Sequence, residues 1–536
     1  MERRLPSRRD FLKMASGAAI GGGLSIARLA RERAFAQARD GAPAQTKADP
    51  ADTTYASARD QAAALAARRV SSAELVARAI ARIESLDGRI NAVVARDFDR
   101  ARAAAAAADA AIARGERRPL LGVPMTVKEA FNVAGLPTTW GIPAFKDWQP
   151  AADAVIVARM KAAGAIVLGK TNVPFVLADW QSYNDVYGTT RNPWDLDRTP
   201  GGSSGGAAAS LAAGYVALEL GSDIGGSLRA PAHFCGVCSH KPSHGLVPSR
   251  GHTPPRVEPL PHEIDLAVVG PMARTAGDLG LALDLIAGPD EPEAVAYRLS
   301  LPAPRHRDLK AFRVLVVDTH PLLPTAAVIR TALDRLATRV GKTGAKVERS
   351  SPLLPDLAVN ARTYSQLLAS VFGADYPMND YRTIQAAVAS LPPDDTSLGA
   401  WRARGAVLSH RDWVAADRVR AGEMRRWRDL FREWDVVLTP VMPTLAFPHD
   451  HSTPMRARRI QIDGADYPYQ DQLVWPGAPT TPGLPATVVP IDRSDAGLPI
   501  GVQIIGPYLE DRTPIAFAEL IEREFGGFVP PPAPPS

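Results

Sequence analysis

The chain has 536 residues, 46% of them hydrophobic and 22% charged, which is ordinary for a globular protein large enough to need no disulfide or metal staple. Its two cysteines exclude a disulfide-rich scaffold and any zinc or iron–sulfur site held by four cysteines. The net charge of +5 lies in the first 38 residues and leaves 54 basic and 54 acidic residues elsewhere, so the body gives no electrostatic basis for binding nucleic acid or an anionic membrane.

The N-terminal segment has the features of an export signal. Arg8 and Arg9 lie within Ser-Arg-Arg-Asp-Phe-Leu-Lys, and an uncharged stretch rich in Gly and Ala follows over residues 14–27. This stretch is too short to span a bilayer as an ordinary helix, and Ala-Phe-Ala at 34–36 offers a cleavage site. Residues 1–36 therefore resemble a twin-arginine (Tat) signal peptide. The alternative is a basic N-terminus without an export role.

The Tat resemblance implies the Tat export machinery as a partner and a periplasmic or secreted mature protein. A polar linker is expected over residues 37–54 and a flexible proline-rich tail over residues 526–536. No other segment has 18 or more consecutive apolar residues, so we expect no integral membrane segment in the mature form.

Strands and helices alternate along residues 55–525, which predicts an α/β layered fold in one large domain. Helices are expected at 58–115 (including the alanine-rich 101–114), 153–163, 207–220, 326–340 and 405–433. Strands are expected at 121–127, 165–168, 312–317, 345–348, 435–438, 486–489 and 501–505.

Three motifs suggest chemistry that their context does not favour. Residues 164–171 match the Walker A pattern, but an apolar strand stands where a phosphate loop needs a flexible turn. Residues 201–205 match Gly-x-Ser-x-Gly, but the nucleophile elbow must follow a strand directly, and here a proline-containing loop precedes it. His449, Asp450 and His451 form a weak metal candidate that is more typical of a solvated loop.

The informative stretch covers residues 199–248. Ser203 and Ser204 lie in one glycine-rich turn and Ser227 in another, and an alanine-rich segment separates the two turns. Glycines let backbone amides approach a bound group closely, and successive amides before a serine can stabilise an oxyanion. Two glycine–serine loops without chemistry would have the same composition.

Several segments together resemble the amidase signature family over roughly residues 75–520. They are residues 122–129, 184–193, 199–206, 221–231, 434–440, 483–486 and 497–507. The resemblance implies an α/β/α layered single domain around a large mixed β-sheet. It also implies hydrolysis of a carboxylic amide to an acid and an amine or ammonia, with no metal and no organic cofactor. The family usually has a different residue and then glycine where this chain has Cys238 and Ser239.

The resemblance also assigns roles to individual residues. Lys128 matches the catalytic lysine, Ser203 the serine that relays protons, and Ser227 the nucleophile. The oxyanion hole maps onto the backbone amides of Ile224, Gly225, Gly226 and Ser227. Ser204, Asp223 and Arg229 are expected to support the site, the last two by holding the glycine turn through hydrogen bonds or an ion pair.

The chemistry explains these residue types. A serine hydroxyl is a weak nucleophile and needs a base, and a lysine can serve if burial keeps its amine neutral. The serine relay needs an unusual orientation, which a cis peptide bond could supply. Trp140, Tyr183 and Asn184 are candidates for the substrate pocket. Cys235 and Cys238 are expected to be buried thiols, with a redox pair as the alternative.

Two other functions remain as alternatives. One is the amidotransferase subunit that frees ammonia from glutamine for tRNA-linked chemistry, against which the Tat leader and the neutral body argue. The other is a non-catalytic binding protein, against which the presence of Lys128, Ser203 and Ser227 together argues. The physiological substrate is left open among small-molecule amides, peptide amides, carbamates and esters, and the assembly state is left open between a monomer and a homodimer.

Overall fold

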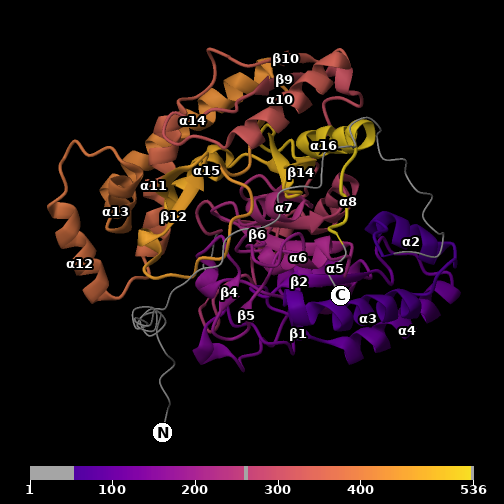
Figure 1. Ribbon diagram of the computed structural model, residues 1–536. Coiled ribbons are helices and arrows are strands. Elements are labelled where there is room, and N and C mark those ends of the chain that lie inside the picture. Colours follow the sequence, from indigo (N-terminus) through magenta and orange to yellow (C-terminus); the bar gives the residue numbers. More distant parts are fainter. Residues whose placement is uncertain (1–53, 259–262, 533–536) are drawn as a thin grey trace, which may run out of the picture.

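The computed structural model describes residues 54–258 and 263–532, and a mixed sheet of 11 strands runs through their centre (Figure 1). The strand order is β1-β3-β2-β6-β8-β7-β14-β15-β11-β9-β10. The strands are β1 Val93–Arg96, β2 Pro124–Lys128, β3 Ile166–Thr171, β6 Leu218–Asp223, β7 Cys238–Lys241, β8 Val268–Ala273, β9 Arg313–Val316, β10 Lys346–Glu348, β11 Val436–Pro440, β14 Ala486–Arg493 and β15 Pro499–Ile505.

Strand β2 lies between β3 and β6 and is parallel to both. Strands β2, β3 and β6 are buried along their whole length, which suits strands covered on both faces. Parallel neighbours end at the same edge of a sheet, and this edge is where α/β proteins usually place their sites. The carboxyl ends of β2 and β6 therefore present their last residues to each other.

Helices flank the sheet, and the predicted α/β/α layered fold around a large mixed β-sheet is confirmed (Figure 1). Helix α6 packs on β2 and β6, α7 on β14 and β15, and α16 on α8 and β14. The helices are α2 Ala58–Ala66, α3 Ser72–Ile90, α4 Phe98–Ala113, α5 Val155–Ala162, α6 Gly205–Ala212, α7 Arg229–Cys235, α8 Ala276–Ile286, α9 Glu291–Ala294, α10 Ala327–Lys342, α11 Leu357–Gly373, α12 Met378–Ala389, α13 Leu398–Ala406, α14 His410–Glu433, α15 Val474–Thr480 and α16 Arg512–Phe525.

Three expectations about the elements were wrong. The helix expected at 207–220 ends at Ala212, because Gly214 takes a positive φ of 74° and the chain then enters the central strand β6. The helix expected at 405–433 is two helices, since Ser409 caps α14 by accepting from the amide of Asp412. Strand β1 interrupts the helices expected over 58–115.

The signal peptide lies outside the described residues, and so do all but the last residue of the linker. Residues 526–532 of the expected tail contain neither helix nor strand. Within the described ranges, none of the helices combines the length and apolar character that a bilayer crossing requires.

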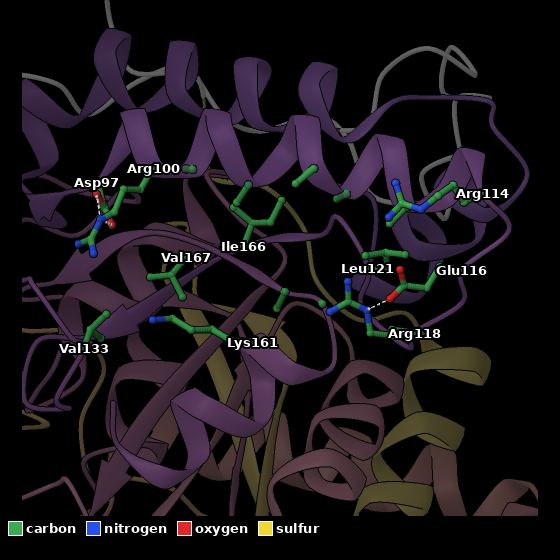
Figure 2. A pocket seen from close by; sticks show the side chains of 17 residues that line it. Asp97, Arg100, Arg114, Glu116, Arg118, Leu121, Val133, Lys161, Ile166 and Val167 are labelled. Carbon is green, nitrogen blue, oxygen red and sulfur yellow. Dashed lines mark hydrogen bonds and ion pairs between the residues drawn. The ribbon is translucent and has the colours of Figure 1, made fainter. Parts of the chain in front are cut away.

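A cavity of about 490 Å³ lies between the alanine-rich face of α4 and strand β3 (Figure 2). Arg100, Arg114 and Arg118 lie around its edge. Arg100 is paired with Asp97 and Arg118 with Glu116. None of the residues lining the cavity belongs to either glycine–serine turn.

Candidate active site

The side chain of Lys128 joins the ends of two strands. Lys128 is the last residue of β2 and is fully buried. Its Nζ donates to Ser203 Oγ over 2.7 Å and to Ser222 Oγ over 2.9 Å. Ser222 stands near the end of β6, the parallel neighbour of β2. The pairing of the two strands therefore brings the Ser222 hydroxyl to the amine, and the turn before α6 supplies the Ser203 hydroxyl.

Burial controls the charge of this lysine. Loss of solvation disfavours the ammonium form and lowers the pKa of Lys128 from 10.5 to about 7, although the carboxyl groups of Asp223 and Glu219 act in the opposite direction. A large fraction of the amine is thus neutral at neutral pH. Glu219 is itself buried, and burial raises its pKa to about 8, which weakens its influence as an anion.

The turn that carries Ser203 leads directly into α6. The Gly202–Ser203 peptide bond is cis. A side chain at position 202 would overlap the carbonyl oxygen of Asp179, so only glycine fits at this position. The backbone amide of Ser204 donates to the carbonyl of Ser227 over 3.2 Å. This bond joins the two serine turns directly.

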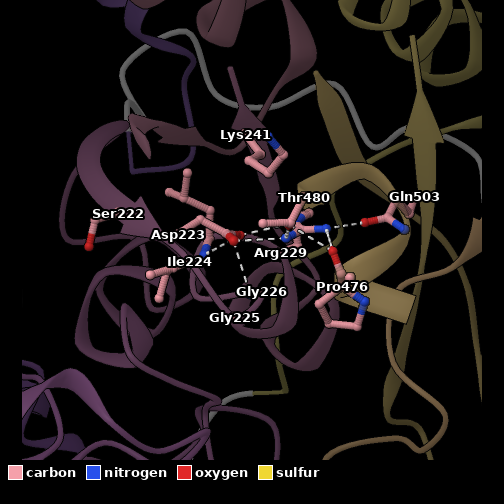
Figure 3. Close-up of polar contacts among 12 residues, drawn as sticks. Ser222, Asp223, Ile224, Gly225, Gly226, Arg229, Lys241, Pro476, Thr480 and Gln503 are labelled. Atoms are coloured by element: carbon pink, nitrogen blue, oxygen red, sulfur yellow. Dashed lines mark hydrogen bonds and ion pairs between the residues drawn. The ribbon is translucent and has the colours of Figure 1, made fainter. Parts of the chain in front are cut away.

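The turn that carries Ser227 is built around the carboxylate of Asp223 (Figure 3). This carboxylate accepts from the amide of Gly226 over 2.9 Å and from the amide of Leu228 over 3.1 Å. It also accepts two bonds from the guanidinium of Arg229, at 2.9 and 2.8 Å. Burial alone would raise the pKa of Asp223, but the neighbouring Arg229 holds it below the usual value. The predicted supporting ion pair of Asp223 and Arg229 is therefore present.

Arg229 also ties the turn to the C-terminal part of the chain. Its guanidinium donates to the carbonyl of Pro476 over 2.9 Å, to Thr480 Oγ1 over 2.8 Å and to Gln503 Oε1 over 2.7 Å (Figure 3). Together with the two bonds to Asp223, these contacts use all five N–H donors of the guanidinium. The residue is fully buried, so each lost contact would leave a polar atom without water.

Replacing Arg229 with methionine should lower the free energy of unfolding by about 3–5 kcal/mol, because the buried carboxylate of Asp223 loses its partner. Urea unfolding followed by circular dichroism measures this change. The matched control is Arg512→Met, which removes an exposed ion pair with Asp284 and should cost less than about 1 kcal/mol. Equal losses in the two variants would show that the buried pair does not hold the turn.

The turn offers several backbone amides to a ligand. Among residues 54–258 and 263–532, no acceptor is found for the N–H groups of Ile224, Gly225 and Ser227. The sequence assigned Gly226 to the same oxyanion hole, but its N–H donates to Asp223 because that carboxylate folds back over the turn. The remaining three amides can bind a negatively charged oxygen.

The three residues proposed for the substrate pocket have mainly structural contacts. Asn184 is buried, and its amide donates to Asn172 Oδ1 over 2.8 Å and to the carbonyl of Val173 over 2.7 Å. The ring of Trp140 lies 5.1 Å from that of His252. Tyr183 stacks on His451 with 3.6 Å between ring centres.

The structure places the other motifs in contexts that do not fit the phosphate-loop, nucleophile-elbow or metal interpretations. The Walker-like segment is strand β3, and Lys170 Nζ donates to Thr138 Oγ1 over 2.7 Å. Residues 201–205 follow a loop rather than a strand. Cys235 and Cys238 are buried free thiols, as predicted, and burial raises the pKa of both. In the described part of the chain, no cluster of three or more His, Cys, Asp or Glu residues could hold a metal.

Sequence reasoning missed Ser222 as a partner of Lys128. It stands in the quoted segment 221–231, directly before Asp223, but nothing in the motif separates it from the other small residues. Its role follows only from the pairing of β2 with β6.

Comparison with known proteins gives a consistent result. The family model described as Amidase matches residues 74–514. A glutamyl-tRNA(Gln) amidotransferase subunit of Anaeromyxobacter sp. (strain K) is 36% identical over 504 residues, which cover 89% of this chain and 97% of that protein. Indoleacetamide hydrolase of Bradyrhizobium diazoefficiens is 34% identical over 469 residues, which cover 85% and 84%.

The solved structures include a bacterial aryl acylamidase described as a member of the amidase signature enzymes. It matches with a TM-score of 0.72 at 26% identity, over 88% of this chain and 96% of that one. Both the sequence match and the fold extend over nearly the whole described body. The chain therefore belongs to the amidase signature family of amide-hydrolysing enzymes.

Proposed function

We propose that the protein is an exported amidase that hydrolyses a linear carboxylic amide through an acyl-enzyme on Ser227. The observation that carries the proposal is the buried contact of 2.7 Å between Lys128 Nζ and Ser203 Oγ, beside a glycine turn with unused backbone amides. A lysine with a pKa near 7 can act as a base at neutral pH.

Lys128 is the base that receives the proton in the first half of the reaction. The neutral amine has two N–H donors and one lone pair, so it can donate to Ser222 while it accepts the proton of Ser203. Ser203 in turn takes the proton of Ser227, whose Oγ attacks the amide carbon and forms the C–O bond. The amides of Ile224, Gly225 and Ser227 stabilise the negative oxygen of the tetrahedral intermediate.

The second half of the reaction returns the protons. The C–N bond breaks, and Ser203 passes a proton to the departing nitrogen while Lys128 returns its proton to Ser203. Water then attacks the ester carbon and gives a proton through Ser203 to Lys128. The C–O bond to Ser227 breaks, and the proton returns through Ser203 to Ser227 Oγ as the acid leaves. Every step uses side chains and backbone amides of this chain, so the proposal includes no metal and no organic cofactor.

A substrate panel tests the reaction and separates it from the amidotransferase alternative, which the 36% identity to an amidotransferase component supports. The purified mature protein is assayed with indole-3-acetamide, 4-nitroacetanilide, a peptide amide, 4-nitrophenyl acetate and glutamine. We expect turnover of at least one non-glutamine amide without any partner protein. Ammonia release from glutamine alone would instead favour the amidotransferase role. Light scattering of the same preparation decides between a monomer and a homodimer.

Export is proposed from the sequence of the leader. Replacing Arg8 and Arg9 together with lysine should leave the protein in the cytoplasm, because the Tat machinery reads the arginine pair. Cell fractionation and immunoblotting of both versions measure this. The matched control replaces Arg3 and Arg4 with lysine and should be exported normally. If the Arg8/Arg9 variant reaches the periplasm as the natural chain does, the leader is not a Tat signal.

A further inference from the structure

In the turn over residues 224–227, the orientation of each backbone carbonyl also sets the direction of the following backbone N–H group. A peptide group is planar and trans, so the C=O of one residue and the N–H of the next point in opposite directions. A donor that fixes the carbonyl of residue 224 therefore also fixes the N–H of Gly225. The same relation connects the carbonyl of Gly225 with the N–H of Gly226.

Two side chains from distant segments bind these carbonyls. The phenol of Tyr364 on α11 donates to the carbonyl of Ile224 over 2.5 Å. The indole Nε1 of Trp180 donates to the carbonyl of Gly225 over 2.8 Å. The next carbonyl, of Gly226, accepts from the backbone amide of Ala230 over 2.7 Å. The orientation of the first two peptide groups of the turn is thus held by hydrogen bonds from side chains.

The turn itself has little intrinsic rigidity at these positions. A Cβ added at Gly225 would make only ordinary van der Waals contacts, with the Leu473 side chain at 3.6 Å and the Tyr364 hydroxyl at 3.9 Å. Gly226 has a positive φ of 91°, and glycine is the residue with the greatest backbone freedom. Without external hydrogen bonds, the peptide between Ile224 and Gly225 can rotate, and its N–H then leaves the direction of a bound oxygen.

Trp180 is held by a buried network of its own. Asp179 pairs with Arg458 over 2.6 Å, and both side chains are almost completely buried. Asp179 also accepts from the phenol of Tyr469 over 2.7 Å, and the hydroxyl of Thr199 donates to the carbonyl of Trp180 over 3.1 Å. These contacts fix the backbone on both sides of the indole.

Tyr364 is equally constrained. It is fully buried, and a Cβ at Gly477 would come within 2.5 Å of its ring. Helix α15 therefore approaches the ring closely only because residue 477 is glycine. Both donors are thus rigid groups delivered by elements far from the turn in the sequence, and rigid donors keep the amide directions constant during the reaction.

We propose that Tyr364 and Trp180 are positioning residues of the oxyanion hole. Tyr364 directs the N–H of Gly225 at the oxyanion, and Trp180 fixes the adjoining peptide so that the N–H of Gly226 stays on Asp223. The proposal rests on the acyl-enzyme function of Ser227. It adds two residues that act on the transition state through the backbone and do not touch the substrate.

The test uses Tyr364→Phe and Trp180→Phe, which remove one donor each and keep an aromatic ring. Removing a direct oxyanion donor costs about 10²–10³-fold in kcat, and a positioning residue should cost less, about 10-fold, with KM nearly unchanged. Hydrolysis of 4-nitrophenyl acetate should slow by a similar factor, because the ester also forms an oxyanion. The pH at which half of the activity is lost on acidification should not change, since Lys128 is not altered.

Matched controls remove equivalent bonds elsewhere. Tyr508→Phe removes a phenol that donates to the carbonyl of His244 over 3.1 Å, and Trp434→Phe removes an indole bond to Ser351. Both should keep the natural kcat. Thermal unfolding of all variants establishes that they are folded, and Tyr364→Phe decides alone if Trp180→Phe does not fold.

The outcomes separate this inference from the proposed function. If the natural protein turns over the ester and is labelled on Ser227 by a fluorophosphonate, while Tyr364→Phe keeps the natural kcat, the positioning role is wrong and the acyl-enzyme stands. If KM rises and kcat is unchanged, the two residues act in substrate binding and the positioning role is again wrong. If the natural protein is neither active nor labelled, the proposed function itself fails.

Discussion

Replacing Ser227 with alanine should lower amide turnover by about 10⁴-fold or more, to the rate of the uncatalysed reaction plus what binding alone supplies. The variant has no hydroxyl to form the acyl bond, although Lys128, Ser203 and the free amides remain. The fold should be retained, because the hydrogen bond between Ser227 and the neighbouring turn uses the backbone carbonyl of Ser227, which alanine keeps. Steady-state kinetics on the best amide of the panel, with thermal unfolding of both proteins, measures the effect.

A serine outside the site is the control for this variant. The hydroxyl of Ser370 on α11 donates to the carbonyl of Leu367 over 2.7 Å, within its own helix, and Ser370→Ala should retain the natural rate. Turnover of Ser227→Ala within 10-fold of the natural enzyme would contradict the role of Ser227 as nucleophile.

The second large effect concerns the base. Lys128→Arg should remove most amide hydrolysis, because arginine stays protonated and cannot accept the proton of Ser203. Lys128→Ala should have a loss of similar size, about 10²–10⁴-fold, the usual contribution of a general base. If Lys128 served only as a positive charge, arginine would partly replace it. Near-normal hydrolysis by Lys128→Arg would therefore contradict the general-base role.

The pH dependence follows from the same residue. Burial lowers the pKa of Lys128 to about 7, and only the neutral amine accepts a proton. The natural enzyme should therefore lose kcat/KM as the pH falls through about 7 and keep it at neutral to alkaline pH. Residual hydrolysis of 4-nitrophenyl acetate by Lys128→Ala should lack this acidic limb. An unchanged limb in that variant would assign the titration to another group.

Much of the fold could be predicted from local sequence. The strands expected at 165–168, 312–317 and 501–505 fall on β3, β9 and β15, because short apolar runs between turn residues favour buried strands. The segment after the alanines of α6 was assigned wrongly. Alanine has a high helix propensity, but residues 218–223 pair with both β2 and β8, and this pairing outweighs propensity.

Only those residues of the candidate site that lie within a recognisable motif could be predicted from the sequence. Lys128, Ser203 and Asp223 lie in short segments that resemble a known family, and the structure brings Lys128 and Ser203 into contact. No motif indicates Trp180 or Tyr364. Tyr364 lies 140 residues from the carbonyl that it binds, and a contact over such a separation depends on helix packing that local patterns do not encode.

The most direct test of the account is the position of covalent labelling. The purified natural protein is treated with a fluorophosphonate and digested, and the adduct is mapped by mass spectrometry. We expect a single adduct on Ser227, formed with a rate that falls as the pH drops through about 7, and no adduct in Ser227→Ala. An adduct on Ser203 or Ser204 in the natural protein would contradict it, because the nucleophile would then be the serine assigned here to proton relay or support.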